Sequence, residues 1–541
     1  MQTIVLPKDR PAPRGLTIAS IGLVIAILLP LIAVLVFGVK ALMEPQTLLE
    51  LAQSVLLEYT LNTLLLAFIA GAVALGFGLP GAWFLSAYEF KGRGLLSWSL
   101  VIPMAMPAYV LAYAYTDALD PSGWLYRAGA EQLLQLGLVL PRIDIRSLWG
   151  AGIILGVALS PYVSLLARAA FEERQGAAFD AARVMGLSPA QIFFRLAMPL
   201  ARPAWIAGLA LVVMECFADY GTVAFFSVPT LSTGLFKAWF SYGDRSSAAL
   251  IAVMMLIFVA ALLWIEINAR GKAQWSTGRT GTKPNRIIVR GRSAVAMALF
   301  CACPGLIGFV FPVLLLLHAA LAADSMPNFS ALLGQATSTV ILGLAAVAVI
   351  LPAAWICAYV VRNGRSLAVK AVRIASAGYA VPGLVIAVGL LAWSSLFTQL
   401  MDLLFNWRVA LVATGVLLIG AYLTRFFSVG LGAIESGLSR VTRNIEWSAS
   451  SLGLTPLQIF WQVHLPLMRK ATGVAALLIF VDVVKELPAT LVLRPFNLET
   501  LAVAAHHLAA DELLSQAAWP ALMIGVVGLI PLLLLGPALR R

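Results

Sequence analysis

Twelve apolar stretches, each about long enough to cross a bilayer, constrain this chain more than any other feature. A hydrocarbon core of ~30 Å is crossed by roughly 20 apolar residues in a helix. The sequence therefore predicts an all-α polytopic membrane protein with about twelve transmembrane helices. The predicted spans lie at about 16–39, 60–87, 95–116, 148–170, 204–226, 247–268, 294–320, 336–361, 374–397, 409–430, 471–493 and 516–538.

Composition and charge placement agree with this interpretation. Hydrophobic residues make up 61% of the chain and charged residues only 11%, with a mean hydropathy of +0.93, which is typical of a membrane protein. The net charge of +12 resides on basic residues that lie between apolar stretches, so nucleic acid is not an expected partner. The cysteines at 216, 301, 303 and 357 fall inside apolar stretches and are expected to be small buried hydrophobes, not disulfides or metal ligands.

Basic residues also predict the orientation. The first apolar stretch follows Lys8, Arg10 and Arg14, but it is longer than the 7–15 residues of a signal-peptide core, so we expect a retained helix. An even number of spans places both termini on one side of the membrane. The positive-inside rule makes that side the cytoplasm, because most Lys and Arg residues then lie inside.

The chain divides into two related halves. A shift of 267 residues places Gly186 on Gly453 and Pro199 on Pro466, and it also aligns two acidic positions, as described below. The predicted parts are residues 1–270, a basic cytoplasmic linker at 271–292, and residues 293–541. For the linker, a plain positive-inside loop and a lipid-binding segment are both open. Because each half has an even number of spans, the halves are parallel six-helix repeats with a predicted pathway between them.

Two polar inside loops repeat one design. In the first, a helix at 180–185 is expected to end at Gly186 in a left-handed conformation, and Ser188 with Pro189 then starts a second helix reaching about residue 195. In the second, Gly453, Thr455 and Pro456 stand in the same places, and the second helix reaches about residue 463.

These loops resemble the EAA loop of binding-protein-dependent ABC importer permeases: EAA, three residues, Gly, nine residues, Ile-x-Leu-Pro. The first copy reads Asp180, Ala181, Ala182, Gly186, Leu196, Met198 and Pro199 in register. The second has Trp447, Ser448 and Ala449 in place of EAA, with Glu446 one position early, followed by Gly453, Val463, Leu465 and Pro466. The resemblance implies that the loops dock on two copies of an ATPase subunit. The implied coupling residues are Asp180, Ala181, Ala182, Gly186, Ser188, Pro189, Leu196, Pro199, Glu446, Ala449, Gly453, Thr455, Pro456 and Pro466.

Ionisable side chains occur inside two related spans. Glu215 and Asp219 lie in the fifth, and Asp482, Lys485 and Glu486 in the eleventh. Residues four apart share one helix face, so each acid pair predicts an acidic stripe. Two interpretations remain open. In one, these charges pair and lock helices together. In the other, the acids line the pathway, and Asp219 and Glu486 transiently bind a hard cation.

Three longer segments resemble the fused ferric-iron permeases of the ABC type, and the resemblance covers nearly the whole chain. They are residues 101–115, 216–226 and 481–502. The resemblance implies a type I ABC importer permease fold (MetI-like) in a bacterial inner membrane, supplied by a periplasmic or lipid-anchored substrate-binding protein. The chain lacks the GxxxxGK[ST] motif, so it is not expected to be an enzyme or to bind a cofactor, and ATP with Mg is expected on the partner ATPase.

Two other kinds of transporter share features of this sequence. A fused thiamine permease has the same architecture, and a proton-driven twelve-helix secondary transporter also has parallel repeats and buried carboxylates. The duplicated Gly-and-Pro loops favour an ATP-driven importer, because a proton-driven carrier has no use for them. Pro103, Pro107, Pro382 and Pro488 are expected to kink their spans. The histidines at 318, 464, 506 and 507 are expected to be solvated and not metal ligands.

Overall fold

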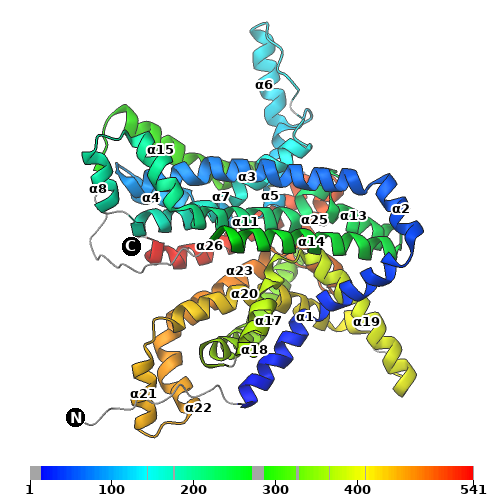
Figure 1. Ribbon diagram of the computed structural model, residues 1–541. Coiled ribbons are helices and arrows are strands. Elements are labelled where there is room, and N and C mark those ends of the chain that lie inside the picture. The colour runs from blue at the N-terminus through cyan, green and yellow to red at the C-terminus, as the bar shows by residue number, and fades with distance from the viewer. Residues whose placement is uncertain are drawn as a thin grey trace, which may run out of the picture. The chain divides into compact units, whose positions relative to one another are not determined.

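The chain folds almost entirely into helices (Figure 1). The computed structural model describes residues 14–142, 144–174, 177–270, 286–323, 328–364, 366–407 and 410–539. Among these residues, nine helices are long and apolar enough to cross a membrane, or eleven if each of two bent helix pairs is one span. The prediction of an all-α, multi-span chain is therefore confirmed, whereas the count of twelve continuous spans is not.

The helices group into two compact units. The N-half unit contains residues 41–332 and 501–541, and the C-half unit contains residues 1–40 and 333–500. The units therefore do not coincide with the sequence halves, because residues 1–40 cluster with the second half and residues 293–332 with the first. The 1–270 and 293–541 division stays a prediction about the repeat, and most of the predicted linker, residues 271–285, lies outside the described residues.

Short 3₁₀ and π turns (η) interrupt many of the α-helices. The elements of the N-half unit are α2 (Pro45–Ser54), α3 (Leu56–Ala87), β1 (Tyr88–Glu89), α4 (Arg93–Ser99), η1 (Ile102–Ala105), α5 (Ala108–Leu119), α6 (Trp124–Gln135), α7 (Leu148–Arg174), α8 (Ala177–Val184), α9 (Pro189–Ile192), η2 (Phe193–Ala197), α10 (Met198–Leu200), α11 (Arg202–Ala218), α12 (Gly221–Phe225), α13 (Leu231–Phe236), η3 (Lys237–Ser241), α14 (Arg245–Arg270), β2 (Ile287–Ile288), α15 (Arg292–Gly305), η4 (Leu306–Val310), α16 (Phe311–Leu321), α25 (Leu501–Ala510) and α26 (Leu514–Leu539).

The C-half unit has fewer elements. They are α1 (Arg14–Leu42), α17 (Phe329–Asn363), α18 (Ser366–Ala375), η5 (Ser376–Ala380), α19 (Gly383–Phe405), η6 (Leu411–Thr414), α20 (Val416–Leu438), α21 (Arg443–Ser451), α22 (Pro456–Ile459), η7 (Phe460–His464), α23 (Leu465–Lys485) and α24 (Pro488–Leu493).

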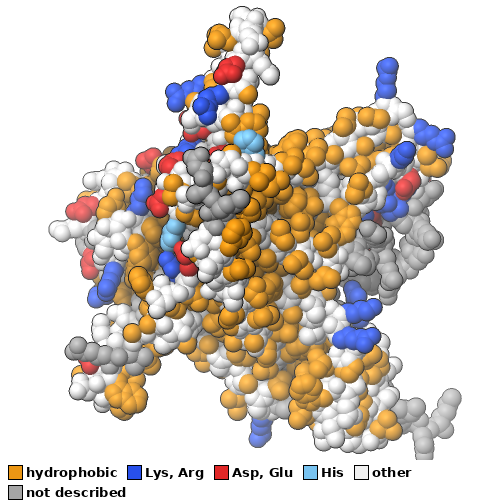
Figure 2. Space-filling model, turned by 180° about the vertical axis from the view of Figure 1, so that it is seen from behind, with side chains coloured by type: hydrophobic (Ala, Val, Ile, Leu, Met, Phe, Trp, Pro, Cys, Tyr) orange, Lys and Arg blue, Asp and Glu red, His pale blue; other side chains and the backbone are white. Residues whose placement is uncertain are grey.

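Small residues let the long helices of the N-half unit pack closely, while large apolar side chains face outward. A Cβ atom on Gly208 in α11 would lie 2.8 Å from the Tyr162 carbonyl oxygen in α7, so only glycine fits at this crossing. Phe68 in α3 and Trp264 in α14 are 72% and 68% exposed. Hydrophobic side chains cover most of the face in Figure 2. Such exposure in spanning helices is expected of side chains that face lipid.

Several predicted spans are broken where a kink was expected. The third bends by 93° between Arg93–Ala105 and Ala108–Gln135, and Pro107 precedes the first residue of α5. Pro382 precedes α19 in the same way, and Pro488 is the first residue of α24. The predicted eleventh span is divided into α23 and α24, and it is not among the candidate spans of the described residues. A proline that starts a helix costs no hydrogen bond, because that N–H would be unpaired anyway.

Candidate functional site

The first loop has the predicted two-helix geometry. Helix α8 ends where the Gly186 N–H bonds the Arg183 carbonyl at 2.9 Å and the Leu187 N–H bonds the Ala182 carbonyl at 3.1 Å. Gly186 has φ of +81°, in the left-handed region that glycine adopts without steric cost. Ser188 then caps α9 reciprocally: the Gln191 N–H donates to Ser188 Oγ, and the Ser188 N–H donates to Gln191 Oε1.

The second loop repeats this geometry in the C-half unit. Gly453 has φ of +83°, and its N–H bonds the Ser450 carbonyl at 3.1 Å. Thr455 and Gln458 form the same reciprocal cap on α22, which begins at Pro456. The local structure predicted for both loops is confirmed. The coupling role of their residues stays a prediction.

The second helix of each loop, α9 or α22, continues into a π turn that the sequence did not predict. These two helices are called the coupling helices after their predicted role. The turns are η2 and η7, which the 267-residue shift superimposes. In each turn a backbone N–H bonds the carbonyl five residues earlier: Met198 to Phe193, and Leu465 to Phe460. Pro199 and Pro466 come directly afterwards, and a proline cannot bond the carbonyl four residues before it. The π turn therefore lets the helix continue past each proline.

A tryptophan of a long helix packs against each coupling helix. In the N-half unit the Trp83 ring centroid lies 5.7 Å from that of Phe193, and in the C-half unit Trp355 lies 5.2 Å from Phe460. Phe171 and Phe179 complete the cluster around Trp83. Sequence reasoning missed this contact, although Leu-Pro-x-Ala-Trp stands at both 79–83 and 351–355. In each unit the second helix of the loop is thus joined to a long apolar helix, α3 or α17, by aromatic contact.

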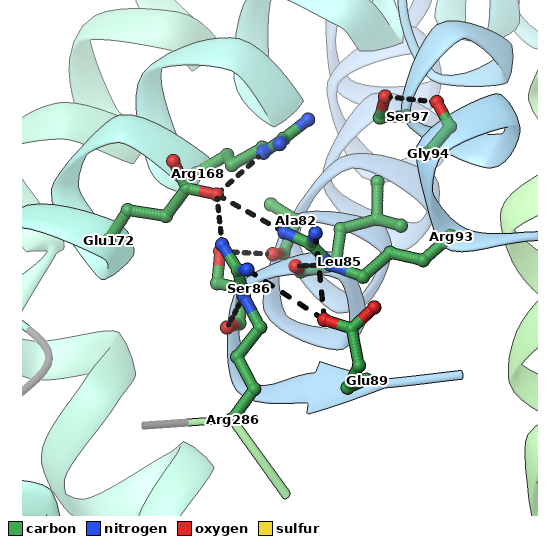
Figure 3. A network of polar contacts seen from close by, with 10 residues as sticks. All are labelled: Ala82, Leu85, Ser86, Glu89, Arg93, Gly94, Ser97, Arg168, Glu172 and Arg286. Atoms are coloured by element: carbon green, nitrogen blue, oxygen red, sulfur yellow. Dashed lines mark hydrogen bonds and ion pairs between the residues drawn. The ribbon is translucent and has the colours of Figure 1, made fainter. Parts of the chain in front are cut away.

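An ion-pair network surrounds the end of α7, where the first loop begins (Figure 3). Glu172, near the end of α7, contacts Arg168 at 3.0 Å and both Arg93 and Arg286 at 3.7 Å. Glu89 contacts Arg93 at 3.8 Å and Arg286 at 3.7 Å. Beside them, β1, which directly follows α3, pairs in parallel with β2, so residues 287–288 of the predicted linker are hydrogen-bonded to this part of the N-half unit. The network joins α3, α4, α7 and β2 at the base of the loop.

In the second loop Glu446 plays a comparable internal part. Its carboxylate lies 2.9 Å from Arg362 and 2.9 Å from His464, and the side chain is 17% exposed. Arg362 also donates to the carbonyls of Leu438 and Val441. The side chain expected to reach an ATPase is therefore turned into its own unit.

His464 corrects the expectation of a solvated ring. Its side chain is 2% exposed, and burial lowers its pKa to about 4. The imidazole is therefore neutral at neutral pH, and Nε2–H donates to Glu446. The sequence gave no local signal for this pairing, because Glu446 and His464 are 18 residues apart and the contact depends on how α21 packs on η7.

The remaining predicted loop residues form an outward surface. Gly186, Ser188 and Pro189 are exposed in the first loop, as are Gly453, Thr455 and Pro456 in the second, and so are Ala181, Pro199 and Pro466. Asp180 is half-buried and pairs with Arg183 at 3.0 Å, whereas Ala182 and Ala449 are buried. Large apolar side chains accompany the exposed set: Phe194 is 65% exposed, Leu457 68% and Trp461 58%. Such a surface suits a protein partner.

Asp219 caps a helix in the middle of its span. Helix α11 ends at Ala218, and the Asp219 backbone is extended, with ψ of 132°. Asp219 Oδ1 accepts from the Thr222 hydroxyl at 3.0 Å, and Oδ2 accepts from the Val223 N–H at 3.1 Å. Helix α11 thus ends between Glu215 and Asp219, and the Asp219 carboxylate accepts from the Val223 N–H, which would otherwise be unpaired at the start of α12. The acidic stripe of Glu215 and Asp219 stays a prediction.

Glu486 does the same in the C-half unit. Helix α23 ends at Lys485, and Glu486 accepts from the N–H groups of Ala489 and Thr490, each at 2.8 Å. The Thr490 hydroxyl adds a contact of 2.5 Å. Asp482 lies inside α23, and Glu486 follows its last residue, so the second acidic stripe also stays a prediction. Asp219 and Glu486 belong to different compact units.

His506, contrary to expectation, is also not solvated, whereas His318 is exposed as expected. His506 lies in helix α25 rather than an exposed loop, is 7% exposed, and its Nδ1 lies 3.0 Å from the Tyr113 hydroxyl. The His318 ring stacks on Trp124 with centroids 4.1 Å apart. The cysteines are free, as expected, with Cys216, Cys301 and Cys357 buried. The described residues contain no group of three or more His, Cys, Asp or Glu side chains arranged to hold a metal ion.

Comparison with known proteins places this geometry in context. Residues 74–273 match the family described as "Binding-protein-dependent transport system inner membrane component". An Fe(3+)-transport system permease protein of Haemophilus influenzae is 24% identical over 88% of this chain and 89% of its own length. A probable molybdenum ABC transporter permease of Haloferax volcanii is 26% identical over 48% of this chain and 92% of its own. The spermidine/putrescine permease PotB of Escherichia coli is 34% identical over 29% of this chain and 56% of its own.

Proposed function

We propose that this chain is a multi-pass permease of the binding-protein-dependent transport family and that it forms the membrane pathway of an ATP-driven importer for ferric iron. The observation that supports ferric iron as the substrate is the share of this chain that aligns with an Fe(3+) permease. The Haemophilus Fe(3+) permease aligns over 88% of the chain, whereas the molybdenum and polyamine permeases align over 48% and 29%. The near-complete alignment with the half-length molybdenum permease supports the proposed two-half organisation.

The two loops are the proposed docking points for two copies of an ATPase subunit. Their exposed apolar side chains support this role because they can bind a protein partner. The helix caps support it because a helix that transmits motion must keep its structure when the partner moves it. ATP binding would close the partner ATPase dimer, and this closure would move each coupling helix. The packing of Trp83 on Phe193 and of Trp355 on Phe460 would carry that motion into α3 and α17. We propose the coupling residues predicted from sequence as the residues of these docking points. Glu446 would not contact the ATPase but would hold the second loop in place through Arg362 and His464.

The remaining partners follow from the same proposal. A periplasmic or lipid-anchored binding protein would deliver the ion to the outer face of a bacterial inner membrane, with both chain termini in the cytoplasm. Glu215, Asp219, Asp482 and Glu486 are the proposed acidic residues of the path. The family match favours this ATP-driven importer over a proton-driven carrier. The chain itself would bind no cofactor, and ATP with Mg would bind the ATPase.

Uptake in proteoliposomes tests the proposal. The chain is reconstituted with its ATPase, and ⁵⁵Fe(III) uptake and ATP hydrolysis are measured with and without the binding protein. We expect uptake to require both ATP and the binding protein, and excess thiamine to leave it unchanged. Uptake without any nucleotide-hydrolysing partner would refute the importer, and competition by thiamine would refute the iron assignment. A second test replaces Phe194 and Trp461 with serine. This double variant is expected to insert in the membrane but to lose the stimulation of ATP hydrolysis by the binding protein.

A further inference from the structure

The two repeat-related carboxylates have different electrostatic surroundings. In the C-half unit, a Cβ atom on Gly383 would lie 2.7 Å from Arg425 Nη1 and 2.9 Å from Glu486 Oε1. A guanidinium and a carboxylate therefore flank the same glycine. Both side chains are buried, with Arg425 8% and Glu486 5% exposed. A neighbouring positive charge offsets the charge of Glu486 and repels a cation.

Asp219 has neutral hydrogen-bond partners instead. Its carboxylate accepts from the Thr222 hydroxyl and the Val223 N–H. Its carbonyl oxygen accepts from the Ser232 hydroxyl at 2.6 Å. A carboxylate held by neutral donors keeps its full negative charge when ionised, so it attracts a cation more strongly than a carboxylate beside a guanidinium.

Further oxygen and nitrogen donors gather where α12 packs against α5 and α25. The Tyr113 hydroxyl lies 3.0 Å from His506 Nδ1, and the Tyr113 ring lies 4.7 Å from Phe225 at the end of α12. Tyr220, next to Asp219 in the chain, has its ring centroid 5.9 Å from that of His506. Asp219 caps α12, the same helix whose Phe225 ring contacts Tyr113.

We propose that Asp219 and Tyr113 form a transient ferric-ion site within the N-half unit, with His506 as the proton acceptor for Tyr113. The inference rests on the proposed iron function and deepens it by choosing one of the two carboxylates. Ferric iron is a hard cation that prefers carboxylate and phenolate oxygens. Tyr113 is buried and Asp219 half-buried, so the ion would reach them when the surrounding helices move apart.

The binding step balances without an oxidant or reductant. The Tyr113 O–H bond breaks, its proton moves to His506 Nδ1, and the phenolate oxygen forms a bond to Fe(III). Iron stays in the ferric state throughout. Release reverses the step, because the proton returns to the phenolate as the iron–oxygen bond breaks. Glu486, beside Arg425, stays a helix cap and makes no bond to the ion.

Uptake by the complete reconstituted transporter tests the assignment. We expect Asp219→Asn and Tyr113→Phe each to lower ⁵⁵Fe(III) uptake at least tenfold. The matched control is Tyr422→Phe, because Tyr422 is equally buried but its hydroxyl bonds Thr490 at 2.7 Å in the C-half unit. This control is expected to stay within twofold of the parent. Binding-protein-stimulated ATP hydrolysis, measured for each variant, reports whether the complex has assembled.

A spectroscopic readout separates binding from transport. Ferric citrate added to the purified chain in nanodiscs should produce the visible charge-transfer absorbance of an Fe(III)–phenolate bond. The band should be absent in Tyr113→Phe, present in Tyr422→Phe, and shifted to higher pH in His506→Gln, which removes the proton acceptor. A parent chain without the band, or a Tyr113→Phe variant that keeps it, would overturn the inference.

The outcomes also distinguish this inference from the proposed function. If the parent imports iron and both Asp219→Asn and Tyr113→Phe import it at the parent rate, the site is wrong while the iron importer stands. If the parent imports no iron under conditions in which its ATPase responds to the binding protein, the iron function fails, and the site fails with it. Should Asp219→Asn not insert, Tyr113→Phe and the absorbance measurement decide.

Discussion

Replacing Gly453 with alanine tests how firmly backbone conformation fixes the coupling helix of the second loop. Gly453 has φ of +83°, and a Cβ atom there would meet nothing within 4 Å. The cost of alanine is therefore conformational and not steric. A left-handed conformation costs an L-residue about 1–2 kcal/mol, so the corner between α21 and α22 should open more often.

Hydrogen–deuterium exchange of the purified chain in nanodiscs measures that opening. A loss of about 1–2 kcal/mol corresponds to roughly 5–30-fold faster exchange for amides protected by the corner. The matched control is Gly473→Ala inside α23, where the new Cβ atom also meets nothing within 4 Å. There φ is helical, so alanine should slow exchange or leave it unchanged. Equal exchange in the two variants, or faster exchange in Gly473→Ala, would refute the reasoning.

Three other predictions concern single contacts. Ser188→Ala and Thr455→Ala each remove a reciprocal helix cap worth about 0.5–2 kcal/mol, so exchange should quicken in α9 and α22 respectively; a change elsewhere in the loop but not there would contradict this. Glu446→Gln leaves Arg362 without its carboxylate partner. Hydrogen–deuterium exchange of α21 should become about tenfold faster or more, because hydrogen bonds to charged groups contribute about 1.5–3 kcal/mol. Exchange identical to that of the parent would show that the carboxylate does not stabilise α21. The Arg146 hydrogen bond lowers the pKa of Glu512, so this contact should be intact above the usual glutamate pKa and lost only as the pH falls below it. In Arg146→Gln the transition of amides 510–515 should move up to the ordinary range, and an unchanged midpoint would contradict the assignment.

The sequence predicted what depends on local chemistry. Gly186 and Gly453 signalled left-handed corners, and Ser188 and Thr455 signalled caps, because each effect is decided within a few residues. The apolar stretches predicted most spanning helices, since length and hydropathy determine whether a segment can cross a bilayer. The duplicated spacing revealed both loops without any knowledge of how their helices pack.

The errors arose where tertiary contacts decide. Asp219 and Glu486 differ from the other cases, because each follows a helix end and accepts hydrogen bonds from residues only three and four positions later, a local break that the apolar pattern concealed. His506 looked exposed because α25 is short and lies between two predicted spans, yet its ring is buried against Tyr113. Glu446 looked like a surface contact, and only the packing of α17 and η7 brings Arg362 and His464 to it.

The tryptophans that pack on the coupling helices have a practical consequence. Indole emission shifts with the polarity and rigidity of its surroundings, and Trp83 touches Phe193 while Trp355 touches Phe460. A derivative keeping one of these indoles and no other would emit according to the position of one coupling helix. Stopped-flow fluorescence on two such derivatives would time the arrival of the nucleotide signal at each loop, and so reveal whether the two are driven together or in turn.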